Sequence, residues 1–128
     1  ETVPVQVEEA LIEFGDLDGL ILDNRMNGGG SSTVVEPILS FLTSGRLGEF
    51  VSRERTRSLA VVADPVHNSQ TVPLVVLVGE DTVSFGEIFS GALKDIGRAK
   101  IVGQTTLGNV ETMYGYDFED VSRAWIAQ

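Results

Sequence analysis

The chain has 128 residues, and its nine Lys and Arg side chains against nineteen Asp and Glu side chains give a formal net charge of −10. It contains no cysteine, which excludes disulfide scaffolds and cysteine-based zinc sites, and its apolar runs are too short to span a membrane. The acidic balance disfavours nucleic acid and anionic lipid as partners, while the composition is that of a globular chain long enough to bury a core.

The first part of the chain predicts a helix, a buried strand and a glycine-rich turn, in that order. Apolar residues recur at helical spacing over 7–14, and Gly15 ends the pattern. The apolar run 19–23 is typical of a parallel strand covered on both faces. The turn at 27–32 contains three consecutive glycines, which leave backbone N–H groups open to a ligand oxygen. By itself this turn is as compatible with a tight bend as with a binding role.

A second helix is predicted after the glycine turn. Thr33 and Glu36 match the S/T-x-x-E capping box, and Pro37 is then acceptable in the first turn because amides there have no helical partner. The helix is expected to close near Gly45. Residues 50–62 alternate poorly and are interpreted as a charged edge strand, with three arginines on one side: Arg53, Arg55 and Arg57.

The strongest strand signal is the uniformly apolar run 73–78. A turn at 79–83 follows it, and apolar spacing over 85–96 predicts a third amphipathic helix. Residues 100–103 predict another short strand. Helices that alternate with short strands indicate an α/β fold with a mainly parallel sheet.

The C-terminal part of the chain is interpreted as polar loop with two strand-like pieces, 113–116 and 124–126. Trp125 is predicted to lie in the core, whereas a core role and a peptide groove stay open for Tyr114, Tyr116 and Phe118. The acidic clusters at 16–18 and 117–120 lack the full calcium-loop pattern and are interpreted as solvated turns.

Ser84 begins the third predicted helix directly after the strand-and-turn segment. With Glu87 three positions later it matches the S-x-x-E capping box, so its role could be to satisfy helix amides. The alternative is a nucleophile at a strand-to-helix junction, where the amide of Phe85 helps to bind an oxyanion. A serine nucleophile also needs a proton acceptor, and local spacing yields no Ser/His/Asp arrangement. The candidate acceptors in the chain are His67, Lys94, Lys100, Glu87 and Glu111.

Taken together, the two turns resemble those of the C-terminal processing (tail-specific) serine peptidases, a family that includes tricorn-type proteases and interphotoreceptor retinoid-binding modules. The family's GLILDLRNNPGG is matched by residues 19–30, which read GLILDNRMNGGG. Its SASEIFAGALKD is matched by residues 84–95, which read SFGEIFSGALKD, and residues 97–103 continue the similarity. Two motifs in this order make the resemblance specific, and it covers most of the chain.

The resemblance implies a crotonase/ClpP-like α/β fold, a mainly parallel sheet with helices packed on it, and a serine-type endopeptidase that works through an acyl-enzyme. Ser84 would be the nucleophile. The oxyanion hole would come from the Gly28–Gly30 turn, through the amide of Gly29 or Gly30, together with the amide of Phe85. No cofactor or metal is expected. The implied partners are polypeptide substrates, unfolded or C-terminal segments, and an oligomer is compatible with the family.

One departure from the family pattern concerns the general base. In most members a lysine follows T-F-G, whereas here residues 106–108 (TLG) are followed by Asn109, whose amide cannot accept the proton. Three explanations stay open. The chain is an inactive form, engineered or natural; the base comes from another segment, as the more N-terminal histidine of tricorn-type relatives does; or a nearby acid takes part, for which Glu111 is the candidate.

The resemblance also predicts the organisation of the protein. Residues 1–128 are expected to form a single domain that is part of a peptidase catalytic domain, with a peptide-binding PDZ module upstream and further structure downstream. It suggests a bacterial envelope or secreted location. Two alternatives stay open: a non-catalytic ligand- or peptide-binding domain of the same fold, and a crotonase-type acyl-CoA enzyme, against which the lack of a basic patch for the CoA phosphates counts.

Overall fold

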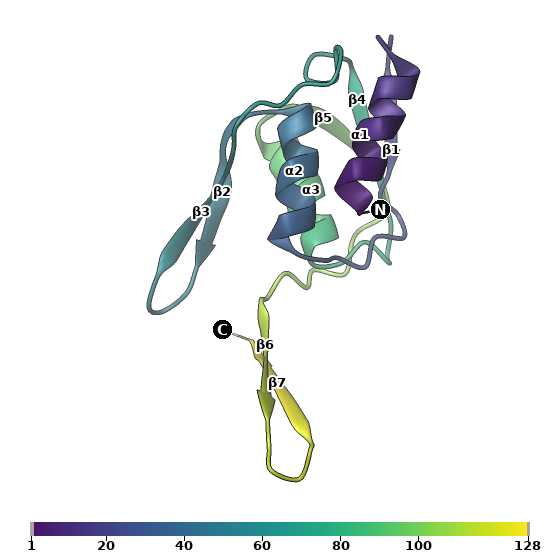
Figure 1. The fold of residues 1–128 in the computed structure, drawn as a ribbon. Coiled ribbons are helices and arrows are strands. Elements are labelled where there is room, and N and C mark those ends of the chain that lie inside the picture. The colour runs from purple at the N-terminus through teal and green to yellow at the C-terminus, as the bar shows by residue number, and fades with distance from the viewer. Residues whose placement is uncertain (1, 128) are drawn as a thin grey trace.

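The computed structural model describes residues 2–127 of the chain (Figure 1). Its central feature is a sheet of three parallel strands in the order β1-β4-β5. Their bounds are Leu20–Asp23 for β1, Leu74–Val78 for β4 and Ala99–Gly103 for β5. The strands that the sequence predicted in these three places are therefore confirmed, and they lie side by side in one sheet.

Three helices pack against one another next to this sheet. They are α1 (Val3–Phe14), α2 (Ser32–Leu42) and α3 (Phe85–Asp95). α1 contacts α2, and α2 contacts α3. The chain passes from β1 through α2 to β4, and from β4 through α3 to β5, in the same direction across the sheet, so right-handed connections put both helices on the same face. This arrangement confirms the predicted α/β class. None of the described helices is long and apolar enough to cross a membrane.

The core lies between the helices and one face of the sheet. Along β4 the side chains alternate between buried and half-buried, as expected for a strand with one well-covered face. The most deeply buried apolar side chains are Leu39, Leu42, Val72, Val76 and Leu93. The prediction that the strand at 19–23 is covered on both faces is wrong, because Ile21 is 67% exposed on the face opposite the helices.

Helix α2 begins earlier than its sequence pattern indicates. Its N-cap is Ser31 in an extended conformation, so the prediction of Thr33 as the cap is wrong. The two hydroxyl groups of Ser31 and Thr33 lie 2.6 Å apart and form a hydrogen bond. Pro37 consequently lies inside the helix, where it cannot donate to the carbonyl of Thr33. The helix ends at Leu42, before the predicted Gly45.

A separate hairpin follows α2 and consists of β2 (Gly45–Val51) and β3 (Thr56–Val61). The prediction of one edge strand over 50–62 is wrong, because a turn divides this segment where the Ser52 N–H donates to the Arg55 carbonyl at 2.9 Å. The hairpin contacts α3 through Phe50, whose ring centroid lies 5.9 Å from that of Phe85. It therefore lies beside the start of the third helix.

The C-terminal segment forms a second hairpin that extends away from the rest of the fold (Figure 1). It consists of β6 (Met113–Asp117) and β7 (Arg123–Ala127), which pair only with each other among the described strands. Trp125 is 59% exposed, so its predicted place in the core is wrong. The physical reason is that no described helix or strand packs against this hairpin closely enough to cover it. Tyr114, Tyr116 and Phe118 are exposed as well.

Candidate functional site

Three loops meet where the parallel strands end. Residues 24–31 follow β1, residues 79–84 follow β4, and residues 104–112 follow β5. The carboxyl ends of neighbouring parallel strands lie at the same edge of a sheet, which is where open α/β sheets bind their ligands. Ser84 stands in the second of these loops, at the N-cap of α3.

The backbone of Ser84 is held in an uncommon conformation. Its φ is 56° and its ψ is −122°, a region that costs a residue with a side chain about 1–3 kcal/mol. The Ser84 N–H donates to Glu87 Oε2 at 3.0 Å and to the carbonyl of Asn109 at 2.9 Å. Ser84 and Glu87 form the predicted capping box. The strained conformation is therefore fixed by its own helix and by the loop that follows β5.

Glu87 ties these loops together through its carboxylate. Oε1 accepts the N–H of Gly108 at 2.7 Å, and Oε2 accepts the N–H of Asn109 at 2.9 Å as well as that of Ser84. Burial acts to raise the pKa of Glu87, but hydrogen bonds from the Thr106 side chain and these three amides outweigh it and lower the pKa below its ordinary 4.5. A carboxylate held ionised by so many donors is a poor proton acceptor, so its role is to position the loops.

The glycine turn after β1 lies directly against Ser84. Gly29 has a φ of 106°, and a Cβ added to it would lie 2.8 Å from the Cβ of Ser84, so only glycine fits. The Gly29 N–H donates to Asn27 Oδ1 at 2.9 Å and is thus already engaged. Gly30, in contrast, lines a pocket next to Ser84. Of the two glycines named as candidates for the oxyanion hole, Gly30 lines the pocket and Gly29 donates its N–H within the turn.

This pocket has a volume of about 230 Å³. It is lined by Gly30, Ser84, Phe85, Ile88, Val110, Glu111, Thr112 and Met113. Four residues that the sequence singled out, Ser84, Gly30, Phe85 and Glu111, therefore share one pocket, and Gly29 adjoins it through its contact with Ser84.

The other candidate proton acceptors lie elsewhere in the fold. His67 is in the loop before β4, and Lys100 pairs with Val75 near the start of that strand, so both belong to the opposite end of the sheet. Lys94 lies in the last turn of α3. Asn109 lies beside Ser84, because its backbone carbonyl accepts the Ser84 N–H. Among the acceptors named from the sequence, only Glu111 lines the pocket without being saturated by backbone donors.

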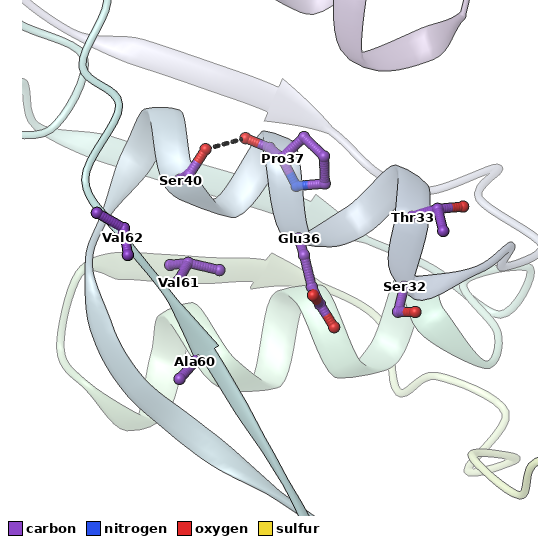
Figure 2. Close-up of a pocket in the computed structure, with 8 residues that line it drawn as sticks. All are labelled: Ser32, Thr33, Glu36, Pro37, Ser40, Ala60, Val61 and Val62. Atoms are coloured by element: carbon purple, nitrogen blue, oxygen red, sulfur yellow. Dashed lines mark hydrogen bonds between the residues drawn. The ribbon is translucent and has the colours of Figure 1, made fainter.

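A larger groove lies between α2 and β3, and Figure 2 shows the side chains around it. Its volume is about 400 Å³, and its lining residues are Ser32, Thr33, Glu36, Pro37, Ser40, Ala60, Val61 and Val62. The Ser40 hydroxyl donates to the Pro37 carbonyl at 2.6 Å, and Glu36 pairs with Arg57 at 3.0 Å. No residue predicted for catalysis lies here. The described part of the chain also contains no group of three metal-ligating side chains.

Sequence reasoning missed a set of polar side chains beneath the site. They are Asn24, Asn27, Thr82 and Ser90, whose hydrogen bonds join the loop after β1 to the loop after β4 and to α3. The available signal was the pair of asparagines three positions apart before the glycines. It was not sufficient, because the residues to which Asn24 bonds, Gly86 and Ser90, lie 62 and 66 positions away in the sequence.

Comparison with known proteins shows the family of the chain. A model of peptidase family S41 matches residues 1–125. A carboxyl-terminal-processing protease of Picosynechococcus sp. is 38% identical over 93 residues, which are 71% of this chain and 22% of the relative. A probable CtpA-like serine protease of Staphylococcus aureus is 29% identical over 108 residues, which are 83% of this chain and 22% of the relative.

A similar solved structure is that of a photosystem II D1 C-terminal processing protease, with a TM-score of 0.82 and 30% identity over 98% of this chain and 33% of that one. This match is consistent with the expected crotonase/ClpP-like fold. The chain thus spans only 22% of the length of the two curated relatives. Because the family model covers nearly the whole chain, the chain belongs to peptidase family S41.

Proposed function

We propose that this chain provides the nucleophile and the oxyanion hole of a serine endopeptidase that cleaves polypeptides in unfolded or C-terminal segments. The observation that carries the proposal is the position of Ser84. Its strained backbone stands at a strand-to-helix junction, Gly29 lies against its Cβ, and Gly30 and Phe85 share its pocket. Such a junction presents a side chain to a substrate next to backbone donors.

In the proposed reaction, the Oγ of Ser84 attacks the carbonyl carbon of the scissile peptide bond while a base takes its proton. The N–H groups of Gly30 and Phe85 bind the resulting oxyanion. The position of Phe85 at the first turn of α3 adds the favourable field of the helix N-terminus. Collapse of the intermediate breaks the C–N bond, and the departing amine takes the proton. Water then hydrolyses the ester on Ser84 and restores the hydroxyl.

The base is the part of this proposal that departs from the family pattern. Asn109 takes the place of the expected lysine, and an amide cannot accept a proton at neutral pH. Glu111 lines the pocket with Ser84, so we assign it the role of accepting that proton or of orienting a base from elsewhere in the protein. The second role is compatible with a chain that spans 22% of its relatives.

Asn109 also favours a second candidate function, a non-catalytic domain that binds peptides or other ligands with the same fold. Its backbone carbonyl accepts the Ser84 N–H, and its side chain, at the position where the family pattern has a lysine, carries no charge. In this alternative the pocket binds a polypeptide segment without cleaving it.

Labelling with a fluorophosphonate separates the two functions. The protein in its natural sequence context is treated with the reagent, and the adduct is located by mass spectrometry. We expect an adduct on Ser84, none in Ser84→Ala, and slower labelling in Glu111→Gln than in the matched hairpin control Glu119→Gln. Folded protein that stays unlabelled at Ser84 but binds a peptide in calorimetry would contradict the peptidase and support the binding domain.

A further inference from the structure

Buried polar side chains are concentrated beneath the candidate site. Among the described residues, four polar side chains are buried, namely Asn24, Ser69, Thr82 and Ser90. Three of them, all except Ser69, belong to one hydrogen-bonded group that joins the loop after β1 to the loop after β4 and to α3. Burying such groups costs free energy unless they are hydrogen-bonded, so their partners indicate what the arrangement holds in place.

Asn24 links the loop after β1 to the start of α3. The side chain is only 6% exposed, and its Nδ2 donates to the carbonyl of Gly86 at 2.9 Å and to Ser90 Oγ at 2.8 Å. Its backbone N–H donates to the carbonyl of Leu77 in β4, and its own carbonyl accepts the Thr82 hydroxyl at 2.8 Å. Asn24 is thus bonded to β4 and its following loop, which precede Ser84, and to α3, which follows Ser84.

Asn27 continues this link to the glycine turn. Its Nδ2 donates to Asn24 Oδ1 at 2.7 Å, and its Oδ1 accepts the Gly29 N–H at 2.9 Å. Its carbonyl accepts the N–H of Val83, the residue before Ser84, at 2.9 Å. One side chain therefore connects the glycine turn to Asn24, while its backbone connects the turn to the loop of Ser84.

The glycine turn also packs closely against Ser84 and the first turn of α3. A Cβ added to Gly86 would lie 2.7 Å from the Asn27 carbonyl, just as one added to Gly29 would lie 2.8 Å from the Ser84 Cβ. A fully paired polar network in a tightly packed place is rigid, because each hydrogen bond is strong in low dielectric. The Gly29 amide donates to Asn27, and the neighbouring Gly30 is the residue of the turn that lines the pocket.

We propose that the side-chain pair Asn24–Asn27 positions the oxyanion hole, by holding the glycine turn so that the Gly30 amide faces the pocket at a set place relative to Ser84 Oγ. Both asparagines are positioning residues that act through the turn. The inference rests on the proposed function, because it assigns the pair a role in that reaction. It also makes a structural statement of its own, that the pair orders the amides of the turn.

The test compares variants of this pair with a matched asparagine at the other end of the sheet. Asn27→Ala removes the link to Gly29, and Asn24→Leu removes the link to α3 while keeping apolar volume. The control is Asn68→Ala, since Asn68 donates to the Leu17 carbonyl at 2.7 Å and accepts the Leu17 N–H at 3.0 Å. For each variant, the rate constant of fluorophosphonate reaction at Ser84, thermal unfolding and amide hydrogen exchange are measured.

We expect Asn27→Ala and Asn24→Leu to slow the reaction at Ser84 by about 10- to 100-fold, since a displaced oxyanion donor is a large part of such catalysis. Asn68→Ala should leave that rate within about twofold even where it lowers the unfolding temperature, because its bonds lie outside the site. The Gly29 amide should exchange faster in Asn27→Ala only. If Asn27→Ala does not fold, Asn27→Asp, which keeps the acceptor for Gly29 but loses the donor to Asn24, should show the same direction.

An unchanged rate in folded Asn27→Ala, or an equal loss of rate in Asn68→Ala, would overturn the proposal. Wild-type protein that does not react at Ser84 would contradict the proposed function itself. In that event hydrogen exchange decides the positioning claim. Faster exchange confined to residues 28–30 in Asn27→Ala supports it, and unchanged exchange there overturns it.

Discussion

The two ends of the central sheet both carry polar networks, but the two networks bind different parts of the structure. At the carboxyl end, Glu87 and the Asn24–Asn27 pair converge on a glycine turn and a strained Ser84. At the amino end, Arg98 donates from Nε to the Leu42 carbonyl at 2.8 Å and from Nη2 to the Ser69 carbonyl at 2.7 Å.

The amino-end bonds satisfy the carbonyl of Leu42 at the end of α2 and that of Ser69 in the loop before β4, so their effect is on stability. The carboxyl-end bonds instead hold a hydroxyl side chain in an uncommon backbone conformation beside an open pocket. A polar network thus indicates a candidate site when it holds a strained, accessible side chain, and a structural role when it satisfies the ends of elements. Four predictions test this difference.

The largest effect is expected from supplying a base at the carboxyl end. Because the Asn109 carbonyl accepts the Ser84 N–H, a lysine at this position starts next to the nucleophile. We expect Asn109→Lys to raise the rate of reaction at Ser84 by about 10²- to 10⁴-fold, with a rate that increases as the lysine loses its proton at higher pH. Peptide hydrolysis and fluorophosphonate labelling across pH measure this. Asn109→Ala is the control, and a folded Asn109→Lys with wild-type rates would refute the prediction.

The second prediction concerns the close packing of α3 against the glycine turn after β1. Gly86→Ala puts a Cβ 2.7 Å from the Asn27 carbonyl and should lower the free energy of unfolding by about 3 kcal/mol. Gly91 lies in the same helix with no neighbouring atom within 4 Å of an added Cβ, so Gly91→Ala should stabilise by up to about 1 kcal/mol. Urea unfolding of both variants makes the comparison. Equal effects would show that the contact of Gly86 is unimportant.

The third prediction concerns the carboxylate that joins Ser84 to the loop after β5. Glu87→Gln replaces a double acceptor by one carbonyl oxygen and should cost about 2 kcal/mol of unfolding free energy at neutral pH. The pKa of Glu87 is lowered by folding, so its contribution is present above the unfolded pKa and is lost as the pH falls through the folded value, below about 4.5.

Unfolding of wild type and Glu87→Gln between pH 3 and pH 7 therefore should show a stability difference that narrows toward acid pH. Glu119→Gln, in the hairpin turn, is the control for removing one negative charge. A difference that stays constant or widens toward acid pH would be evidence against the role assigned to Glu87.

The smallest effect is expected at the amino end. Arg98→Met removes the donors to Leu42 and Ser69 but keeps most of the side-chain length, and should cost about 1 kcal/mol of unfolding free energy. The reaction rate at Ser84 should not change, because these bonds lie at the amino end of the sheet and Ser84 lies at its carboxyl end. Thermal unfolding and labelling of the same preparation test both parts. A slower reaction at Ser84 in this variant would remove the distinction between the two ends.

Much of the fold could be predicted where a local pattern and a tertiary role coincide. The apolar run of β4 and the helical spacing of α3 each need only neighbouring residues to be recognised, and both are confirmed. The glycine turn and Ser84 were also evident, since the turn contains three consecutive glycines and Ser84 begins the second motif that resembles the family. The division of 50–62 into a turn and parts of two strands was not, because charged hairpins lack a clean apolar alternation.

Other features depended on what surrounds a side chain. A tryptophan is predicted to be buried by its chemistry, but Trp125 lies on a hairpin that extends from the fold and is 59% exposed. In the same way Thr33 matches a capping box, yet the N-cap of α2 is Ser31, because the helix begins directly after the glycine turn.

The sequence by itself determined the α/β order of elements, the resemblance to the processing peptidases and four of the residues that line the candidate site. Only the tertiary structure decided how these residues are held. It directed the Gly29 amide to Asn27, brought Gly30, Phe85 and Glu111 around Ser84, and joined Asn24 to Gly86 and Ser90 across 62 and 66 positions. Local spacing carries no information about such partners, because hydrogen bonds over that separation exist only once adjacent strands have brought their ends together.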